Sequence, residues 1–198
     1  MKPFSESCQR NQTPIFAILC EVFANTRCVL EIGSGTGQHA VYFGKALPHL
    51  IWQTSDLPDN HAGILAWLNE AALINVKSPL ALNVEDGVWP LATVDGIFSA
   101  NTAHIISWPQ VTAMFAGIGR VLAPGGIACL YGPFNFAGTY TAESNARFDV
   151  WLKARDPLSG IRDFEAVDAL ARAQGLVLQH DYAMPANNRM LVWQRIPA

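Results

Sequence analysis

The chain has 198 residues, of which 51% are hydrophobic and 15% charged, and its formal net charge is −3 at pH 7. This composition fits one well-buried globular domain and excludes a disordered or fibrous protein. A negative balance without any Lys/Arg cluster argues against a nucleic-acid partner. No apolar run reaches the ~20 residues of a membrane span, and the N-terminus lacks a signal-peptide core. We therefore expect a cytoplasmic protein with no membrane partner.

Thr13–Pro14 pairs a capping residue with a proline, so a helix is expected to start there. Apolar residues recur at helical spacing after it, from Ile15 to Phe23. The following expected elements are strand Cys28–Ile32, helix Gly37–Leu47, strand Leu50–Ser55, helix His61–Leu73 and strand Pro79–Leu82.

The second half continues the alternation with strand Val94–Ala100 and a helix that Ser107 caps and that runs from Pro109 to Leu122. A Pro-Gly-Gly turn then leads into strand Ile127–Tyr131. The remaining expected elements are a helix near Ala142–Ala154, a helix capped by Asp163 and ended at Gly175, and strands Leu176–Tyr182 and Met190–Ile196.

Alternating strands and helices predict a mostly parallel seven-stranded α/β sheet with helices on both faces. The last two strands are joined by too few residues for a crossover helix. They must pair as a hairpin, which makes the last strand antiparallel. Without repeats or linkers, residues 1–198 are expected to form a single domain.

The four cysteines, Cys8, Cys20, Cys28 and Cys129, include no C-x-x-C pair. This indicates neither a zinc site nor a redox motif, and no other metal cluster is apparent. We expect the four thiols to behave as small buried hydrophobes in a reducing compartment.

Three glycines, Gly33, Gly35 and Gly37, follow the first strand at alternate positions and precede a helix. Such a turn lets a ligand approach the main chain and the free N–H groups of the helix start. The dinucleotide pattern G-x-G-x-x-G/A can be laid on Gly35, Gly37 and Ala40. The stretch from Glu31 fits E-x-G-x-G-x-G better. Asp56, at the end of the second strand, can accept the ribose hydroxyls of either kind of cofactor.

The E-x-G-x-G-x-G stretch resembles the first motif of the class I S-adenosylmethionine-dependent methyltransferases. Asn83 stands where that family places an Asp near the adenine, and Asn can still accept a hydrogen bond. Val94–Asn101 and Leu122–Gly126 resemble the family's fourth strand and the turn before its fifth. The resemblance implies a Rossmann-like class I methyltransferase fold, with an antiparallel strand inserted near the edge of the sheet.

A closer resemblance, to the methyltransferase-like protein 26 family, spans nearly the whole chain. It rests on Pro3–Asn11, Glu31–Ala40, Ser99–His104, Tyr131–Phe134 and Met184–Asn188. The resemblance implies S-adenosylmethionine as the cofactor. It supplies no substrate, because that family has long been catalogued as a domain of unknown function.

These motifs define a set of expected cofactor contacts. The N-terminal arm and helix, residues 1–26, are expected to cover the pocket, where Arg10 would pair with a carboxylate of the cofactor or substrate. The expected cofactor-binding residues are Glu31, Gly33, Ser34, Gly35, Gly37, His39, Asp56, Leu57, Asn83, Val84, Asn101, Arg10 and Asn11.

His104 is the candidate catalytic residue because it follows the fourth strand, where substrate meets donor in such folds. An imidazole with a pKa near ~6.5 suits a general base. The alternative is a histidine packed under the cofactor or bonded to backbone. The expected substrate contacts are His104, Tyr131, Asn135 and Asn187.

The preferred hypothesis is a methyltransferase that acts on a small molecule by in-line transfer from the sulfonium. No D/N-P-P-Y motif of amino-methylating enzymes is present, because Thr102 and Ala103 follow Asn101. The alternative is a non-catalytic cofactor-binding or protein-interaction module on the same fold. An NAD-dependent oxidoreductase is disfavoured by the C-terminal hairpin. Substrate and oligomeric state stay open.

Overall fold

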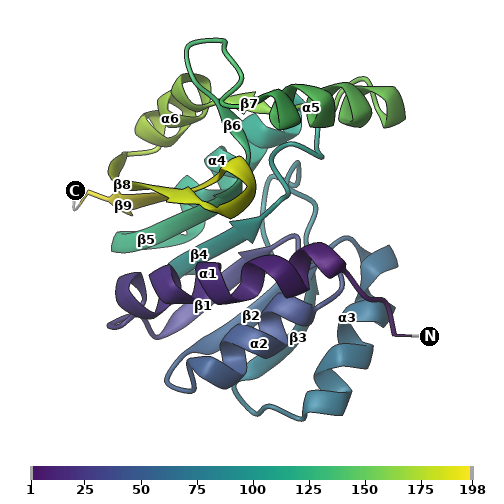
Figure 1. Cartoon of the computed structure of the whole chain (residues 1–198). Coiled ribbons are helices and arrows are strands. Elements are labelled where there is room, and N and C mark those ends of the chain that lie inside the picture. The colour runs from purple at the N-terminus through teal and green to yellow at the C-terminus, as the bar shows by residue number, and fades with distance from the viewer. Residues whose placement is uncertain (1, 197–198) are drawn as a thin grey trace.

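A seven-stranded sheet in the order β3-β2-β1-β4-β5-β9-β8 forms the centre of the molecule (Figure 1). The computed structural model describes residues 2–196, so Met1 and residues 197–198 of the expected domain lie outside the described part. The strands are β1 Cys28–Ile32, β2 Ile51–Asp56, β3 Val76–Ala81, β4 Val94–Ala100, β5 Leu122–Gly132, β8 Leu176–Met184 and β9 Asn188–Arg195.

Strands β1 to β5 of this sheet run parallel, whereas β9 is antiparallel to both of its neighbours, β5 and β8. The predicted C-terminal hairpin is therefore confirmed. Its last strand is inserted between β5 and the edge strand β8.

Helices cover both faces of the sheet, as the strand–helix alternation predicted. On one face lie α1 (Glu6–Val22), α2 (Gln38–Ala46) and α3 (Pro58–Ala71), which share a buried cluster with Val29 and Phe98. Figure 1 shows α1 and α2 side by side on this face. On the other face lie α4 (Trp108–Val121) and α6 (Phe164–Ala173).

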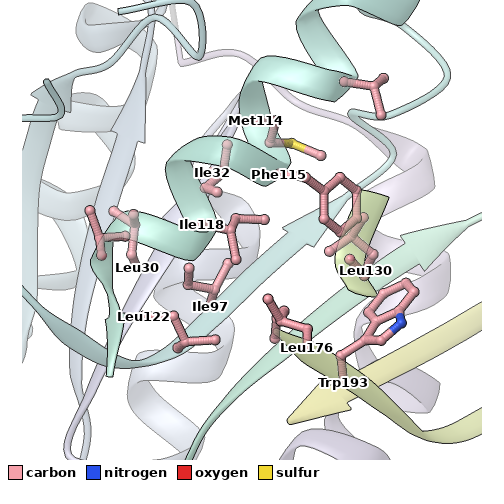
Figure 2. Packing of buried hydrophobic residues seen from close by; sticks show 14 of the residues in the cluster. Leu30, Ile32, Ile97, Met114, Phe115, Ile118, Leu122, Leu130, Leu176 and Trp193 are labelled. Atoms are coloured by element: carbon pink, nitrogen blue, oxygen red, sulfur yellow. The ribbon is translucent and has the colours of Figure 1, made fainter. Parts of the chain in front are cut away.

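The second cluster packs α4 against the middle of the sheet (Figure 2). One face of α4 carries Met114, Phe115 and Ile118 at helical spacing. These side chains pack against strand residues that point to this face of the sheet, among them Leu30 and Ile97. Trp193 on β9 stands edge-on to Phe115, with 5.9 Å between the ring centroids. This packing holds the antiparallel strand in the sheet.

Helix α5 (Glu143–Arg155) belongs to neither large cluster. It lies beside a small two-stranded sheet made of β6 (Phe134–Asn135) and β7 (Arg162–Asp163). A short 3₁₀ helix, η1 (Pro185–Asn187), joins β8 to β9.

Four expected boundaries were wrong by three residues or more. Strand β5 begins at Leu122, five residues before the expected Ile127, so the expected Pro-Gly-Gly turn lies within the strand. Helix α1 begins at Glu6, not at Thr13, because Ser5 caps it through the Cys8 amide at 3.3 Å, and Pro14 lies inside the helix. Helix α3 begins at Pro58, three residues before the expected start. Strand β3 begins at Val76 and not at Pro79.

Two further local expectations also differ from the structure. Asp163 occupies the N-cap position of α6, but its side chain makes no capping hydrogen bond. Only Cys129 is buried, whereas Cys8, Cys20 and Cys28 are half-buried. Between residues 2 and 196, no helix combines the length and the apolar character needed to cross a bilayer.

Candidate cofactor and acceptor site

The carboxyl ends of the parallel strands gather most of the expected site residues at one edge of the sheet. The glycine turn follows β1, Leu57 follows β2, and Asn101 follows β4 and donates its amide to the Tyr131 carbonyl at 2.8 Å. Strand β9 starts beside the end of β5, where Arg189 is paired with Gly132. In open α/β sheets, ligands bind at this edge.

All three glycines of the turn have positive φ, at +73° for Gly33, +57° for Gly35 and +87° for Gly37. A Cβ on Gly33 would lie 2.6 Å from Thr102 Oγ1, and one on Gly37 would lie 3.0 Å from the Ile64 Cα. A Cβ on Gly35 would meet nothing within 4 Å. Gly33 and Gly37 are thus required by close packing, whereas Gly35 faces open space.

Glu31 lies beneath the turn and is only 2% exposed. Its Oε2 accepts hydrogen bonds from Ser34 Oγ at 2.8 Å and Trp52 Nε1 at 3.1 Å. Burial raises the pKa of this carboxyl group to about 7, although both donors oppose the shift. Glu31 and Ser34, both expected to contact the cofactor, therefore brace the turn from inside the protein.

Asp56 connects the turn to α3. Its Oδ2 accepts the Gly35 amide at 2.7 Å, while Oδ1 accepts the Leu57 amide at 2.8 Å and Asn60 Nδ2 at 2.7 Å. An ionised carboxylate offers about four acceptor sites, so these three bonds leave room for another donor. Asp56 thus shapes the turn and retains capacity for a ligand hydroxyl.

Asn83 and Val84 follow β3 and are half-buried. The Asn83 side-chain oxygen accepts the Glu85 amide at 3.1 Å, which closes a local turn. Val84 packs against the core cluster that includes α4. Both residues lie after a neighbouring strand at the same edge, and the Asn83 oxygen, which accepts one hydrogen bond from its own loop, has a second lone pair left for a ligand.

The N-terminal arm is fixed to the helix that follows the glycine turn. The Ser5 amide donates to Gln38 Oε1 at 2.5 Å, and Gln38 Nε2 donates back to the Ser5 carbonyl at 3.3 Å. His39 Nε2 lies 2.7 Å from Asn11 Oδ1, and burial lowers the pKa of His39 to about 4. Because the Asn11 oxygen can only accept, the proton of the neutral ring lies on Nε2 in this contact.

The structure does not bring Arg10 to this group. Its side chain is 67% exposed, and its guanidinium pairs with Glu6 one helical turn away, at 3.0 Å. The sequence analysis did not single out Gln38, which anchors the arm. Its place directly after Gly37 was the only available signal, because the partner Ser5 lies 33 residues away.

His104 is 4% exposed, and its ring stands edge-on to Phe148 of α5, with 5.4 Å between the ring centroids. A Cβ on Gly132 would lie 3.4 Å from its Nδ1. Burial, and secondarily the charge of Arg162, lower the pKa of His104 to about 4. The imidazole is therefore neutral near pH 7, but its pKa lies well below the value near ~6.5 that the sequence led us to expect, so it is a weaker base than expected.

The other expected substrate contacts differ in their placement. Tyr131 is 5% exposed, and burial raises the pKa of its hydroxyl although Asn11 and Asn188 oppose the shift. Asn135 is buried, and its Oδ1 has no hydrogen-bond partner among residues 2–196. Asn187 is exposed, has a positive φ of +58° and donates to Ser144 Oγ at 3.1 Å, so it binds α5.

The described part of the chain contains no cluster of side chains suited to binding a metal ion. No group of three or more His, Cys, Asp or Glu side chains lies close enough together there to hold an ion. The edge of the sheet instead combines main-chain donors, one buried carboxylate at Asp56 and two neutral imidazoles.

A family model described as "Protein of unknown function (DUF938)" matches residues 2–195. Among solved structures, the chain is similar to an O-methyltransferase family protein from Burkholderia thailandensis, with a TM-score of 0.82 and 17% identity over 94% of this chain and 57% of that one. It is also similar to the S-adenosylmethionine-dependent methyltransferase SibL in its apo form, with a TM-score of 0.81 and 21% identity over 96% and 56% of the two chains.

A third similar structure is PigF with SAH, with a TM-score of 0.80 and 16% identity over 93% of this chain and 56% of that one. At these identities the similarity shows the fold, which is that of the class I methyltransferases. The chain spans just over half the length of the three solved proteins.

Proposed function

We propose that this chain, which belongs to the DUF938 family of proteins of unknown function, is an S-adenosylmethionine-dependent methyltransferase that acts on a small molecule. The observation that carries the proposal is the turn at Gly35. There a positive φ, open space above the Cα and the Asp56 carboxylate occur together at the carboxyl edge of the sheet.

The residues present fit an adenosyl cofactor. The open space at Gly35 is where a Cβ would otherwise stand, so a ligand can approach the main chain. Asp56 keeps acceptor capacity for ribose hydroxyls. The antiparallel C-terminal hairpin and the spacing of Gly33, Gly35 and Gly37 favour S-adenosylmethionine over a dinucleotide.

In the proposed site, Gly35, Gly37, Asp56, Leu57, Asn83 and Asn101 hold the cofactor, and Glu31 and Ser34 keep the turn in shape. The bound cofactor would supply an electrophilic methyl group on its sulfonium. The arm of residues 2–26, held through Gln38 and His39, excludes water from the covered side.

His104 is the proposed general base, because its neutral imidazole can take a proton from a nucleophilic O–H or N–H group. Tyr131 lies at the end of β5 and Asn135 in β6, and we assign both to the acceptor. Holding donor and acceptor in line supplies much of the rate in such transfers.

A small-molecule acceptor is supported by the solved neighbours, one of which is an O-methyltransferase family 2 protein in complex with apigenin. The sequence resemblance to the methyltransferase-like protein 26 family supports the same chemistry without naming an acceptor. This chain matches only 57% and 56% of the length of the first two solved proteins. A small-molecule substrate is therefore a proposal for this chain and is not carried over from them.

Calorimetric titration with S-adenosylhomocysteine tests the proposal in the wild type and in Gly35→Ala. A methyl group at Gly35 enters the open space and adds backbone strain, so we expect micromolar binding by the wild type and at least a tenfold loss in the variant. Gly175→Ala is the matched control, because Gly175 also has a positive φ, +74°, and nothing within 4 Å of a Cβ.

Gly175→Ala should lose similar stability and keep wild-type affinity. Equal affinity in Gly35→Ala and the wild type would contradict the assigned site, and binding of NADH in place of S-adenosylhomocysteine would favour an oxidoreductase. Cofactor binding without methyl transfer to any member of a broad metabolite panel would favour the non-catalytic module.

A further inference from the structure

Four consecutive backbone carbonyls around His104 accept hydrogen bonds from one short segment, residues 159–162. Arg162 Nε donates to the Ala103 carbonyl at 3.0 Å, and the Gly160 amide donates to the His104 carbonyl at 2.9 Å. Ser159 Oγ donates to the Ile105 carbonyl at 2.5 Å. Arg162 Nη2 completes the set at the Ile106 carbonyl. This arrangement fixes the main chain on both sides of His104.

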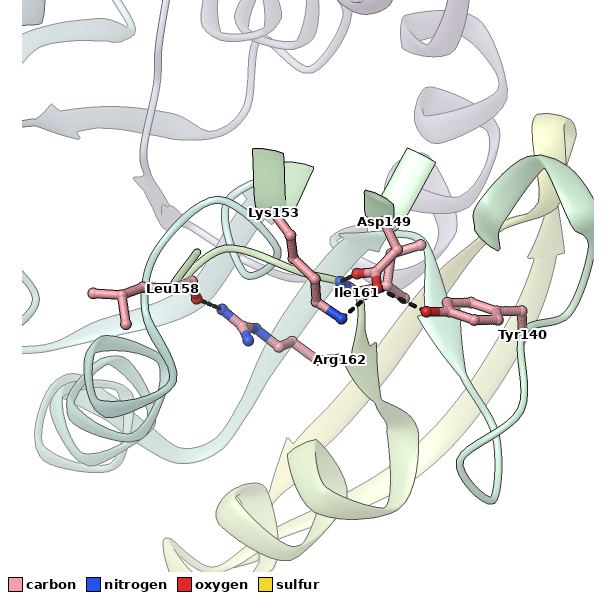
Figure 3. A network of polar contacts seen from close by, with 6 residues as sticks. All are labelled: Tyr140, Asp149, Lys153, Leu158, Ile161 and Arg162. Carbon is pink, nitrogen blue, oxygen red and sulfur yellow. Dashed lines mark hydrogen bonds and ion pairs between the residues drawn. The ribbon is translucent and has the colours of Figure 1, made fainter. Parts of the chain in front are cut away.

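The segment is itself held by Asp149 of α5, which is 2% exposed (Figure 3). Asp149 Oδ1 accepts the Ile161 amide at 2.6 Å, and Oδ2 accepts Tyr140 Oη at 2.7 Å and Lys153 Nζ at 2.6 Å. Figure 3 also shows Arg162 donating to the Leu158 carbonyl, at 2.9 Å. A buried carboxylate with three donors makes this connection rigid.

The His104 ring, in contrast, has no hydrogen bond to any of residues 2–196 that would set its orientation. It is placed by its backbone, by the Gly132 Cα and by the Phe148 ring, which comes from the same helix as Asp149. Orientation of this imidazole therefore depends on the 159–162 segment and on α5.

We propose that Arg162 is a positioning residue for His104, holding the loop Ala103–Ile106 so that the imidazole faces the acceptor. The inference rests on the proposed function, in which His104 is the base. A guanidinium suits this task, since its planar fork reaches two carbonyls, Ala103 and Ile106, at once. A lysine ammonium has no such fork.

The charge of Arg162 has a second consequence for the same ring. The charged and titratable groups on the surrounding elements are Arg162 and Asp163 on β7, Glu143, Arg147, Asp149, Lys153 and Arg155 on α5, and Cys129 and Tyr131 on β5. Asp149 and Lys153 form an ion pair at 2.6 Å, and Arg162 is the charged group that lowers the pKa of His104. Burial is the larger cause of the lowered pKa of His104, and the charge of Arg162 adds to it. Substitution of Arg162 can therefore separate its effect on the position of the ring from its effect on protonation.

Arg162→Lys keeps the charge and loses the fork, whereas Arg162→Met loses both. Nuclear magnetic resonance of ¹⁵N-histidine protein gives two readouts: the titration midpoint of the His104 ring and its Overhauser contact with Phe148. We expect Arg162→Lys to keep the midpoint near 4 and to weaken the ring contact. In Arg162→Met the midpoint should also rise. Ser159→Ala, which removes one neutral donor, should leave the midpoint unchanged.

The proposal is overturned if Arg162→Lys retains the wild-type ring contact, or if a folded Arg162→Met leaves both readouts unchanged. The same samples are titrated with S-adenosylhomocysteine, whose affinity should stay within twofold of the wild type in Arg162→Lys. If the wild type does not bind S-adenosylhomocysteine, the proposed function is wrong. The resonance measurements on the His104 ring do not need the ligand, so the two failures are distinguishable.

Discussion

Glu31 contributes both to the stability of the fold and to the shape of the glycine turn in the proposed site. Its carboxyl group is buried beneath the turn and accepts hydrogen bonds from Ser34 and Trp52. Burial raises its pKa from 4.5 to about 7, so the folded protein keeps a proton that the unfolded chain releases in that pH window. The turn at Gly33–Gly37 is therefore built over a group that titrates near neutrality.

Glu31→Gln tests this account of the buried carboxyl group. Because the folded pKa is raised, the Glu31 contribution to the free energy of unfolding falls as pH rises from 4.5 to about 7 and is flat above it. Glutamine keeps an acceptor for Ser34 and Trp52 without a titration. The stability difference, variant minus wild type, should grow by roughly 2–3 kcal/mol between pH 5 and pH 8.

Urea unfolding at intervals across that range measures the difference. His39 and His104 have lowered pKa values and give both proteins the opposite trend, since the unfolded chain takes up protons at these rings below about pH 6.5 whereas the folded protein does so only near pH 4. Their contributions cancel in the comparison. A stability difference that does not vary with pH would show that Glu31 titrates as an exposed carboxyl group does.

Residue patterns predicted the glycine turn, Asp56 and His104 because each stands at a fixed offset from a strand end. They did not predict how those residues are held. Gln38 binds Ser5, and Arg162 binds the Ala103 carbonyl, across 33 and 59 positions of the sequence. Neither contact has a local pattern, since it exists only after the sheet has formed.

At the scale of elements, boundaries depended on contacts that the local sequence does not contain. The start of α1 at Glu6 follows from the Ser5 cap and its bond to Gln38, whereas the pattern at Thr13–Pro14 is an equally good helix start in isolation. The start of α4 was predicted correctly because its signal is local: Ser107 and Gln110 form a capping box.

The packing of α4 makes an element-scale prediction at Gly117. A Cβ there would lie 1.9 Å from Cζ2 of the buried Trp89, so the indole must move. Alanine favours a helix by about 1 kcal/mol over glycine, yet overpacking costs about 1–3 kcal/mol. We expect Gly117→Ala to lower the free energy of unfolding by roughly 1 kcal/mol net.

A double-mutant cycle with Trp89→Leu isolates that contact. In the Trp89→Leu background, the smaller side chain leaves room, and Gly117→Ala should be neutral or stabilising. If the substitution costs the same in both backgrounds, the clash with Trp89 is not the cause.

For the whole molecule, the strand–helix alternation and the short final connection predicted a parallel sheet with an antiparallel hairpin, and both are observed. These features are global consequences of element order, so they tolerate boundary errors of several residues. The site is less predictable, because Arg10 turns outward to Glu6 and Asn187 turns to α5. Side-chain direction depends on neighbours that element order does not specify.

Hydrogen–deuterium exchange of the whole chain, with and without saturating S-adenosylhomocysteine, tests the central claim most directly. The account predicts slower exchange at the amides of Gly33–His39, Leu57 and Asn101–His104 and in the N-terminal part of α1, with α6 and β8 unchanged. Exchange that is the same with and without ligand, or protection confined to α6 and β8, would contradict a cofactor site at the carboxyl edge of the sheet.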